Sequence, residues 1–345
     1  MRVFCIAQAT IREACCLICT KKICKTCQWV MIRHGRTAAG IQRWRCVRCR
    51  TTSHRRRVDT EQRHRRLWFI RWITGTASLA TIAARLGCTV RTLQRWFADG
   101  WKCIPRTPSW ISPSSIVVLD GTSLVARQEV VLIARAIGND GRIAWSFTPR
   151  ETAAAWSLLL SQIPAPRFVV CDGQKGLLRA IKTYWPATIV QRCLVHVVRQ
   201  SLAWITQRPQ TIAGQHLRPL VGALFDIRTR RKKRKWLRRF RRWCRRWELF
   251  LNARTMHPID RRRWWYTHKK LRRVRTLIER SLPHLFTFVR HPAVPRTSNH
   301  VEGGINAGLH ELFHAHRGLS VGQKRILVAY FLLAKISKKT TRNVY

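Results

Sequence analysis

The stretch IVVLDGTSLV, residues 116–125, is an aliphatic run that ends on an aspartate followed by glycine. A short run of β-branched and aliphatic residues predicts a buried strand over Ile116–Asp120. Acids are scarce in this chain, because 15 aspartates and glutamates stand against 67 lysines and arginines. A carboxylate at the end of a buried strand is therefore a feature that needs a physical reason.

The flanking sequence repeats this pattern in an alternation of strands and helices. The segment RFVVCD (167–172) predicts a second buried strand that also ends on an aspartate followed by glycine. The NDG turn at 139–141 predicts a hairpin between strands at 130–137 and 142–148. Further expected elements are helices at 151–163 and 176–184, a short strand at 188–192 and a helix from Leu194. This order predicts a mixed sheet flanked by helices, an α/β architecture.

Asp120 and Asp172 are candidate metal ligands, since side chains at the carboxyl ends of such strands often face a crevice. Two carboxylates there would suit hard divalent cations, and a pair of such ions can assist phosphoryl displacement. The alternative for either residue alone is that it only forms a turn before glycine.

A third carboxylate would complete such a site. The candidates after Asp172 are Asp226, Glu248, Asp260, Glu279, Glu302 and Glu311. Glu302 lies in RTSNHVEGGINAGL (296–309), at the start of an expected helix over 300–312 that Thr297, Ser298 or Asn299 could cap. Glu302 could instead be a capping-box residue for Asn299, and composition alone does not decide between these roles.

The formal net charge of +52 indicates a polyanionic partner. Nucleic acid binds such a chain favourably along its whole length, because lysines and arginines displace counterions from the phosphates. An anionic membrane surface would also attract the chain, but no window holds the roughly 18 to 20 apolar residues of a spanning helix. The N-terminal residues lack a signal-peptide core. We expect a soluble, intracellular protein that acts on DNA or RNA and not on membranes.

The cysteines predict a zinc site in a first domain at residues 20–53. Two C-x2-C pairs stand 18 residues apart, a spacing typical of a zinc ribbon: Cys24, Cys27, Cys46 and Cys49. The alternative is four unpaired thiols. A further group fits no clean pattern, and one of its members could replace a ribbon ligand: Cys5, Cys15, Cys16 and Cys19.

Residues 60–100 predict a helix-turn-helix domain. Apolar residues recur at helical spacing on both sides of Gly87, and Thr89 can cap the second helix. The second helix would present four side chains to a DNA groove: Arg91, Thr92, Gln94 and Arg95. An ordinary helical hairpin is the alternative.

Residues 209–292 predict a basic, all-helical insertion. In RTRRKKRKWLRRFRRWCRRW (228–247), one helical face carries four aromatic residues, Trp236, Phe240, Trp243 and Trp247. The other faces would track DNA phosphates through residues such as Arg231, Arg234, Arg238 and Arg242. A core helix with a solvated basic face is the alternative, and the two interpretations are compatible. Residues 293–340 are expected to return to helix.

Five short motifs together resemble one family. They are DGT (120–122), CDGQKG (171–176), QRCLVH (191–196), TSNHVEGGIN (297–306) and HRGLS (316–320). In this order they are similar to the DDE transposases of bacterial insertion sequences in the Mutator-like superfamily.

The resemblance implies an RNase H-like fold, built from residues 112–208 and 293–340 around the helical insertion. It implies that Asp120, Asp172 and Glu302 bind two Mg²⁺ (or Mn²⁺) ions. The implied partners are the terminal inverted repeats and target DNA, bound by a homodimer or higher oligomer.

The family's C-x2-H element falls on Cys193 and His196. We expect both to be neighbours of the acids that position them or a substrate phosphate. The alternative is half of a second zinc site, for which His216, His257 and His268 are available as further ligands.

The expected function is metal-dependent DNA cleavage and strand transfer at insertion-sequence ends. A non-catalytic DNA-binding regulator built from the ribbon and the helix-turn-helix is the rival from another class. A nuclease of the same fold that cuts without joining strands is a second rival.

Overall fold

The fold is that of a computed structural model, which describes residues 23–24, 26–38, 40–54, 57–125, 128–138, 141–260 and 262–342. Cys5, Cys15, Cys16 and Cys19 lie outside these residues, as do the turn residues Asn139 and Asp140. Among the described residues, no helix combines the length and the apolar composition needed to cross a bilayer. The described chain forms two compact units, one of residues 109–304 and one of residues up to 108 together with those from 305.

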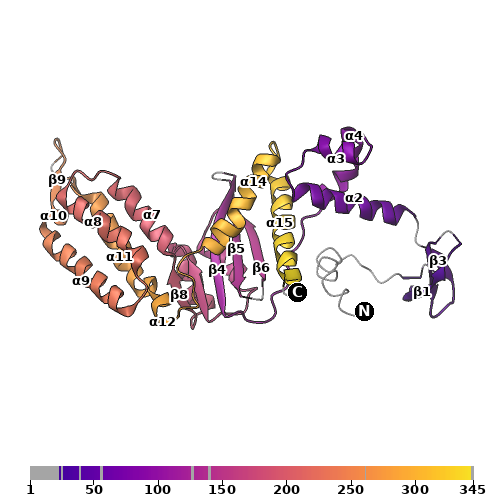
Figure 1. The fold of residues 1–345 in the computed structure, drawn as a ribbon, viewed down its shortest axis with the longest axis horizontal. Coiled ribbons are helices and arrows are strands. Elements are labelled where there is room, and N and C mark those ends of the chain that lie inside the picture. Colours follow the sequence, from indigo (N-terminus) through magenta and orange to yellow (C-terminus); the bar gives the residue numbers. More distant parts are fainter. Residues whose placement is uncertain are drawn as a thin grey trace. The chain divides into compact units, whose positions relative to one another are not determined.

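The unit of residues 109–304 contains a five-stranded mixed sheet, which confirms the predicted α/β architecture (Figure 1). Its spatial order is β6-β5-β4-β7-β8. β4, β5 and β6 pair antiparallel, whereas β7 and β8 continue the sheet in parallel with β4. The strands are β4 (Ile116–Val125), β5 (Glu129–Ile137), β6 (Ile143–Thr148), β7 (Phe168–Cys171) and β8 (Ile189–Arg192).

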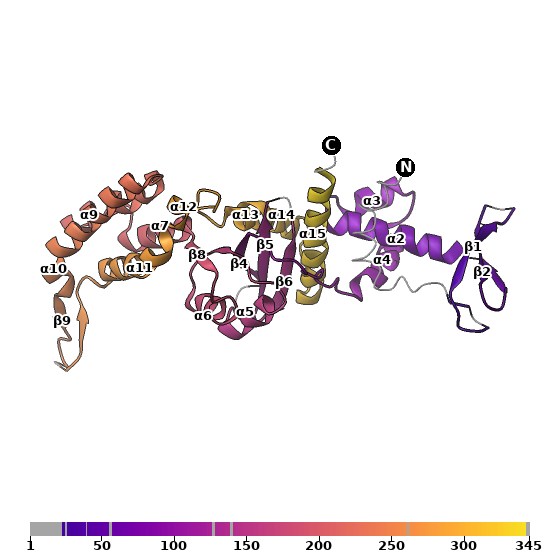
Figure 2. The ribbon, with the colours of Figure 1, turned by 90° about the horizontal axis from the view of Figure 1, so that it is seen from below.

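One face of this sheet packs on α5 (Ala153–Leu160) and α6 (Lys175–Tyr184), which lie together on one side of it (Figure 2). Val117 and Leu119 of β4 join Trp156 of α5 in that core, and all three are fully buried. Because side chains alternate along a strand, Asp120 points to the opposite face of the sheet. The apolar core on one face thus determines which face carries the carboxylate.

β4 is longer than predicted, since it continues to Val125 and does not end at Asp120. Its antiparallel partner β5 extends along the whole strand, whereas its parallel partner β7 pairs only with Ile116–Val118. Asp120 therefore lies where the sheet opens on the β7 side, although the strand itself continues.

The insertion is a helical body with its own apolar core. α7 (Leu194–Ile205), which precedes the insertion, shares this core. The helices of the insertion are α8 (Ile212–Gly222), the 3-10 turn Ala223–Asp226, α9 (Arg230–Arg246), α10 (Glu248–Asn252), α11 (Lys269–Leu285) and α12 (Thr287–Arg290). The prediction that the insertion is all-helical was wrong, because β9 (Arg254–Met256) and β10 (Trp264–Tyr266) form a hairpin. Each strand has only three residues, too few to produce a recognisable alternation of polar and apolar positions.

The aromatic face of α9 belongs to the core of the insertion. Trp236, Phe240 and Trp243 are buried, and their rings stack in sequence along the helix. The indoles donate to backbone oxygens of α8: Trp236 Nε1 to Leu220 at 2.8 Å and Trp243 Nε1 to Ala213 at 3.0 Å. The stripe therefore fixes α9 on α8 and leaves its arginines on the exposed faces.

The second unit holds the N-terminal elements and the last helices. A three-stranded antiparallel sheet comprises β1 (Met31–Arg36), β2 (Gln42–Cys46) and β3 (Thr52–His54). The helices are α2 (Arg57–Ile73), α3 (Leu79–Arg85), α4 (Val90–Phe97), the 3-10 turn Ala98–Trp101, α14 (Ala307–Ala315) and α15 (Val321–Arg342). In the unit of residues 109–304, α13 (Asn299–Val301) continues into a π-helical turn, Glu302–Asn306, within which the chain passes to the other unit.

Aromatic contacts hold the C-terminal helices onto α2 within this unit. Phe69 packs edge-on against Tyr330 of α15, and Trp72 packs edge-on against His316. His316 Nε2 also lies 2.8 Å from the carbonyl oxygen of Gly75. The HRGLS motif at 316–320 thus contributes to packing in this unit.

The α9 interface gives a stability prediction. Phe240→Ala should lower the free energy of unfolding by about 3–5 kcal/mol, because the ring is 2% exposed and stacks on two indoles. Arg241→Ala, at the exposed next position, should change it by no more than about 0.5 kcal/mol. Denaturant unfolding of the full chain, followed by tryptophan fluorescence, measures both. Equal effects of the two substitutions would show that the stripe is not a core element.

Candidate active site

The first two predicted acids lie just beyond the paired stretch of two neighbouring strands. Val117 pairs with Val169 and Val118 with Val170 across the parallel strands β4 and β7. Asp120 lies two residues beyond the last paired position of β4, and Asp172 directly follows the last residue of β7. Among the described residues, ligand atoms of Asp120, Asp172 and Glu302 do not form a group within 4.8 Å of one another. Asp120 is buried, whereas Asp172 is half-buried and its Oδ1 accepts a hydrogen bond from the Gln174 backbone N–H at 2.9 Å.

α7 contributes a row of polar side chains opposite the third acid. Cys193 precedes the helix, and its N–H donates to the Cys171 carbonyl oxygen at 2.7 Å, which ties it to the end of β7. His196 and Arg199 follow at intervals of three residues, so the three side chains share one side of the first turns. The position of these three side chains depends on the sheet, because Cys193 directly follows β8 and is hydrogen-bonded to the end of β7.

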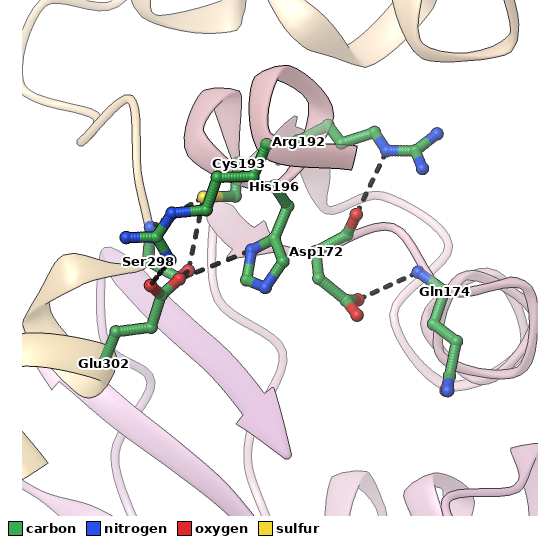
Figure 3. A network of polar contacts seen from close by, with 8 residues as sticks. Asp172, Gln174, Arg192, Cys193, His196, Ser298 and Glu302 are labelled. Carbon is green, nitrogen blue, oxygen red and sulfur yellow. Dashed lines mark hydrogen bonds and ion pairs between the residues drawn. The ribbon is translucent and has the colours of Figure 1, made fainter. Parts of the chain in front are cut away.

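Glu302 is the acid that meets this row (Figure 3). Its Oε1 accepts from the Ser298 hydroxyl at 2.5 Å and lies 3.4 Å from His196 Nδ1, while its Oε2 accepts from Arg199 at 3.2 Å. Ser298 also faces Cys193, whose Sγ lies 3.3 Å from both its N–H and its hydroxyl oxygen. Glu302 therefore contacts long-range partners on α7, in addition to its local contact with Ser298.

The Glu302 side chain does not act as a capping-box residue for Asn299. Its carboxylate bonds with Ser298, His196 and Arg199, and the backbone around it is a π-helical turn. Other candidate acids are engaged within the insertion: Glu248 and Glu279 pair with Arg275, and Asp260 pairs with Arg263.

Cys193 and His196 form a charge-coupled pair. Burial would raise the pKa of the Cys193 thiol, but hydrogen bonds with His196 and Ser298 outweigh it and lower that pKa. The hydrogen bond with Cys193 is the largest influence raising the pKa of His196 to about 9, against the effect of burial. The negative charges of Glu302 and Asp120 raise it further, so the imidazolium stands among the acids as a counter-charge.

A fourth carboxylate, Glu151, lies at the same edge and was missed by the sequence analysis. A Cβ added to Gly121 would stand 2.8 Å from Glu151 Oε2, so the acid packs against the residue that follows Asp120. Its Oε1 accepts from Trp156 Nε1 at 3.0 Å. Burial, and after it the negative charge of Asp172, raises the pKa of the Glu151 carboxyl. No local motif marked this residue, because its proximity to Asp172 arises only when the sheet forms.

The histidines considered for a second zinc site lie elsewhere. His216 packs near Trp247, His268 stacks on Phe250, and His257 accepts backbone N–H groups of its own loop. The third potential ligand beside Cys193 and His196 is Glu302, with ligand atoms of the three within 4.8 Å of one another.

The four ribbon cysteines come together as predicted. Cys24 Sγ lies 3.4 Å from Cys49 Sγ, and Cys27 Sγ lies 3.4 Å from Cys46 Sγ. All four sulfurs lie within 4.8 Å of one another. Thiolates about 2.3 Å from one zinc ion would lie about 3.8 Å apart in a tetrahedron, so this donor set fits zinc. Backbone N–H groups of Thr26 and Cys49 point at Cys24 and Cys46 and would stabilise the thiolates.

The side chains predicted to contact DNA are mostly exposed. On α4, Arg91, Gln94 and Arg95 are exposed, whereas Thr92 is half-buried and its N–H donates to the capping Thr89 hydroxyl at 3.2 Å. The break between α3 and α4 contains Gly87 at φ +63°, a conformation that favours glycine. On α9 the predicted residues are all exposed: Arg231, Arg234, Arg238 and Arg242.

The chain is similar to transposases of bacterial insertion sequences. Residues 113–253 match the family model described as Transposase, Mutator family. This region contains Asp120, Asp172, Cys193 and His196 and ends before Glu302.

Individual relatives match over short regions. The transposase for insertion sequence element IS905 of Lactococcus lactis is 30% identical over 122 residues, 32% of this chain and 31% of that protein. A probable insertion-sequence transposase of Corynebacterium diphtheriae is 36% identical over 61 residues, 18% of this chain and 16% of that protein. The ISRM3 transposase of Rhizobium meliloti is 29% identical over 105 residues, 28% of this chain and 26% of that protein. The matches thus span less than a third of each relative's length.

Among solved structures, a cryoEM structure of the simian T-cell lymphotropic virus intasome with PP2A regulatory subunit B56 gamma aligns with 44% of this chain and 70% of that chain. The sequence identity is 11% and the TM-score is 0.20, too low for this likeness to support an argument about the fold.

The cysteine cluster predicts the metal content of the chain. The purified full chain should carry about one equivalent of zinc, and Cys46→Ser should remove it, because three thiolates would leave the tetrahedral site incomplete. Cys103→Ser, at an exposed cysteine outside the cluster, should leave the content unchanged. Elemental analysis by mass spectrometry measures the zinc. Full retention by the Cys46 variant would assign the zinc to other ligands.

Proposed function

We propose that this chain is a DNA transposase that binds the ends of an insertion sequence and catalyses metal-dependent cleavage and strand transfer. The observation that carries the proposal is that His196 lies 3.4 Å from Glu302 Oε1 and also within electrostatic range of Asp120, although the two acids come from distant segments. Residues 113–253, which contain Asp120 and His196, are similar to Mutator-family transposases. The basic composition supplies the affinity for DNA that such chemistry requires.

The core of residues 112–208 and 293–340 is proposed to be RNase H-like. The strand order β6-β5-β4-β7-β8, with three antiparallel strands followed by two parallel ones, supports this assignment. In this arrangement the first acid lies on the central strand and the second follows its parallel neighbour.

Asp120, Asp172 and Glu302 are proposed to bind two Mg²⁺ or Mn²⁺ ions. The fit rests on the donor chemistry, because all three side chains offer carboxylate oxygens and hard divalent cations prefer oxygen ligands. Such ions would polarise the attacking oxygen and stabilise the leaving oxygen of an in-line displacement at phosphorus. The proposed first displacement uses water and leaves a 3′-OH, which is the nucleophile for the second displacement at the target strand.

His196, Cys193 and Arg199 are proposed to position Glu302. Arg199 and the Ser298 hydroxyl each bond with one carboxylate oxygen, which restricts rotation of the acid. The positive charge on His196 offsets repulsion between carboxylates while no cation is bound. Cys193 stabilises that charge through its hydrogen bond.

The remaining modules are proposed to bind DNA. The zinc ribbon and the α3–α4 helix-turn-helix would recognise the terminal inverted repeats, with α4 in a major groove. The exposed arginines of α9 would contact the phosphates of flanking or target DNA. A homodimer or higher oligomer would hold two element ends together.

The triad is tested by three isosteric substitutions. Asp120→Asn, Asp172→Asn and Glu302→Gln should each abolish cleavage, because an amide is a much weaker ligand for Mg²⁺ than a carboxylate. Binding of the same DNA should persist. Cleavage of a labelled duplex bearing the sequence that flanks the coding region, with and without Mg²⁺ or Mn²⁺, measures the effect.

The same assay separates the proposed function from its rivals. A wild-type chain that binds the duplex but never cuts it would be a regulator, and one that cuts without producing joined strands would be a nuclease. Cleavage at the wild-type rate by any of the three variants would remove that residue from the triad.

Ser298 gives a further prediction about positioning. Ser298→Ala should slow cleavage about 10–100-fold, because Glu302 loses the hydroxyl that orients it. Ser161→Ala, at an exposed serine whose hydroxyl bonds only within α5 and its end, is the matched control. Single-turnover rates at saturating DNA measure both variants. A rate equal to that of the control would show that Glu302 needs no support from Ser298.

A further inference from the structure

A cavity of about 540 Å³ opens beside Asp172, between the sheet edge and the helical insertion. Gly173 and Arg192 form its end nearest the acid, and Arg192 Nε donates to the Asp172 carbonyl oxygen at 3.1 Å. Gly173 has φ +80°, and a Cβ there would stand 2.3 Å from Arg192 Nε. The backbone at 173 thus leaves room for Arg192 to extend along the cavity.

The charge of this cavity has one sign. Six of its lining residues are basic: Lys175, Arg192, Lys269, Arg272, Arg273 and Arg280. No acid is among the lining residues, and none of the six forms an ion pair with a carboxylate in the part of the chain that the structure describes. Arg275 of the same helix α11 differs, since it pairs with Glu248 and Glu279. The side of α11 that faces the cavity therefore lacks the counter-charges present on the other side.

The walls of the cavity are apolar and include two aromatic rings. Trp204, at the end of α7, packs against the core of the insertion and lines the cavity. Tyr266, the last residue of β10, lines it from the hairpin, and the Arg272 guanidinium lies 3.5 Å from its ring centre. Leu178 and Leu277 complete the apolar surface. Both rings are half-buried, so part of each stays accessible.

Flat apolar walls within a cationic rim suit a nucleotide. Aromatic rings stack on a base of any sequence, and arginine and lysine bind the neighbouring phosphates. A paired base within a duplex cannot enter, because its faces are covered by its neighbours in the stack. We propose that the cavity binds one unpaired nucleotide of the DNA strand next to the scissile phosphate, with its base against Trp204 and Tyr266.

The binding part of this inference stands independently of catalysis, whereas the location next to the scissile phosphate rests on the proposed function. The first part is therefore tested without divalent cation, so that no strand is cut. Two labelled duplexes of identical length are compared, and they differ by a single unpaired thymidine in one of them. The full chain should prefer the duplex with the unpaired nucleotide.

Removal of either ring should weaken binding of that duplex. Trp204→Ala and Tyr266→Ala should each reduce its affinity about 5- to 150-fold, which corresponds to the cost of losing one base–aromatic stack, and leave the fully paired duplex unaffected. Tyr266→Phe keeps the ring and should keep the preference. Trp265→Ala, at an exposed neighbour on β10 outside the cavity, is the matched control.

Photocrosslinking locates the base directly. With 5-iodouracil at the unpaired position, the crosslinked peptide should contain Trp204 or Tyr266. Crosslinks elsewhere, or an unchanged preference in both alanine variants, would overturn the inference.

The position along the strand is tested in the Mg²⁺ cleavage assay. An unpaired nucleotide next to the cleaved phosphate should accelerate cleavage, and the same nucleotide placed a helical turn away should not. Equal acceleration at both positions would overturn the location. If the wild-type chain cuts no DNA at all but the crosslink maps to Trp204 or Tyr266, the proposed transposase activity fails and the nucleotide site stands.

Discussion

The parallel register between β4 and β7 is the constraint on which the candidate site depends. With Val118 opposite Val170, Asp120 lies two positions further along β4, and Asp172 directly follows the end of β7. A shift of one residue would turn Asp120 toward the apolar face covered by α5 and α6, where Val117 and Leu119 are buried. Burying the Asp120 charge on that face would cost free energy, which favours the observed register. The register in turn determines that the two acids follow the paired stretch of neighbouring strands.

The electrostatics of the site follow from the same constraint. The negative charges of Asp120 and Glu302 are offset by two cations. His196 has its pKa raised to about 9, and Arg199 forms an ion pair with Glu302. All six charged residues that line the neighbouring cavity are basic. The basic side chains around the acids would therefore attract a DNA phosphate backbone toward them. Bound divalent metal ions would neutralise the acids themselves. The acids would thus hold the metal ions, and the surrounding basic residues would hold the DNA phosphates.

Much of the fold was accessible from local patterns, and part of the site was not. The aliphatic runs before Asp120 and Asp172 predicted their strands, and the capping Thr89 and the break at Gly87 predicted α3 and α4. The β9–β10 hairpin was missed because three-residue strands leave no periodic signal. Glu151 was missed for a different reason: it belongs to a loop before α5 and approaches Asp172 only through the folded sheet. The aromatic stripe of α9 was recognised, but only its stacking under α8 showed that it is a core surface.

The sequence by itself determined the strands and helices of the sheet domain, the pairing of C-x2-C motifs and the basic character of the whole surface, because each depends on spacing or composition within a short segment. The tertiary structure decided which side chains surround the acids. Glu302 contacts Arg199 across 103 positions of the chain, and the nucleotide cavity combines Gly173 with Tyr266. Such contacts depend on how the insertion returns to the sheet edge, and no local periodicity encodes that path.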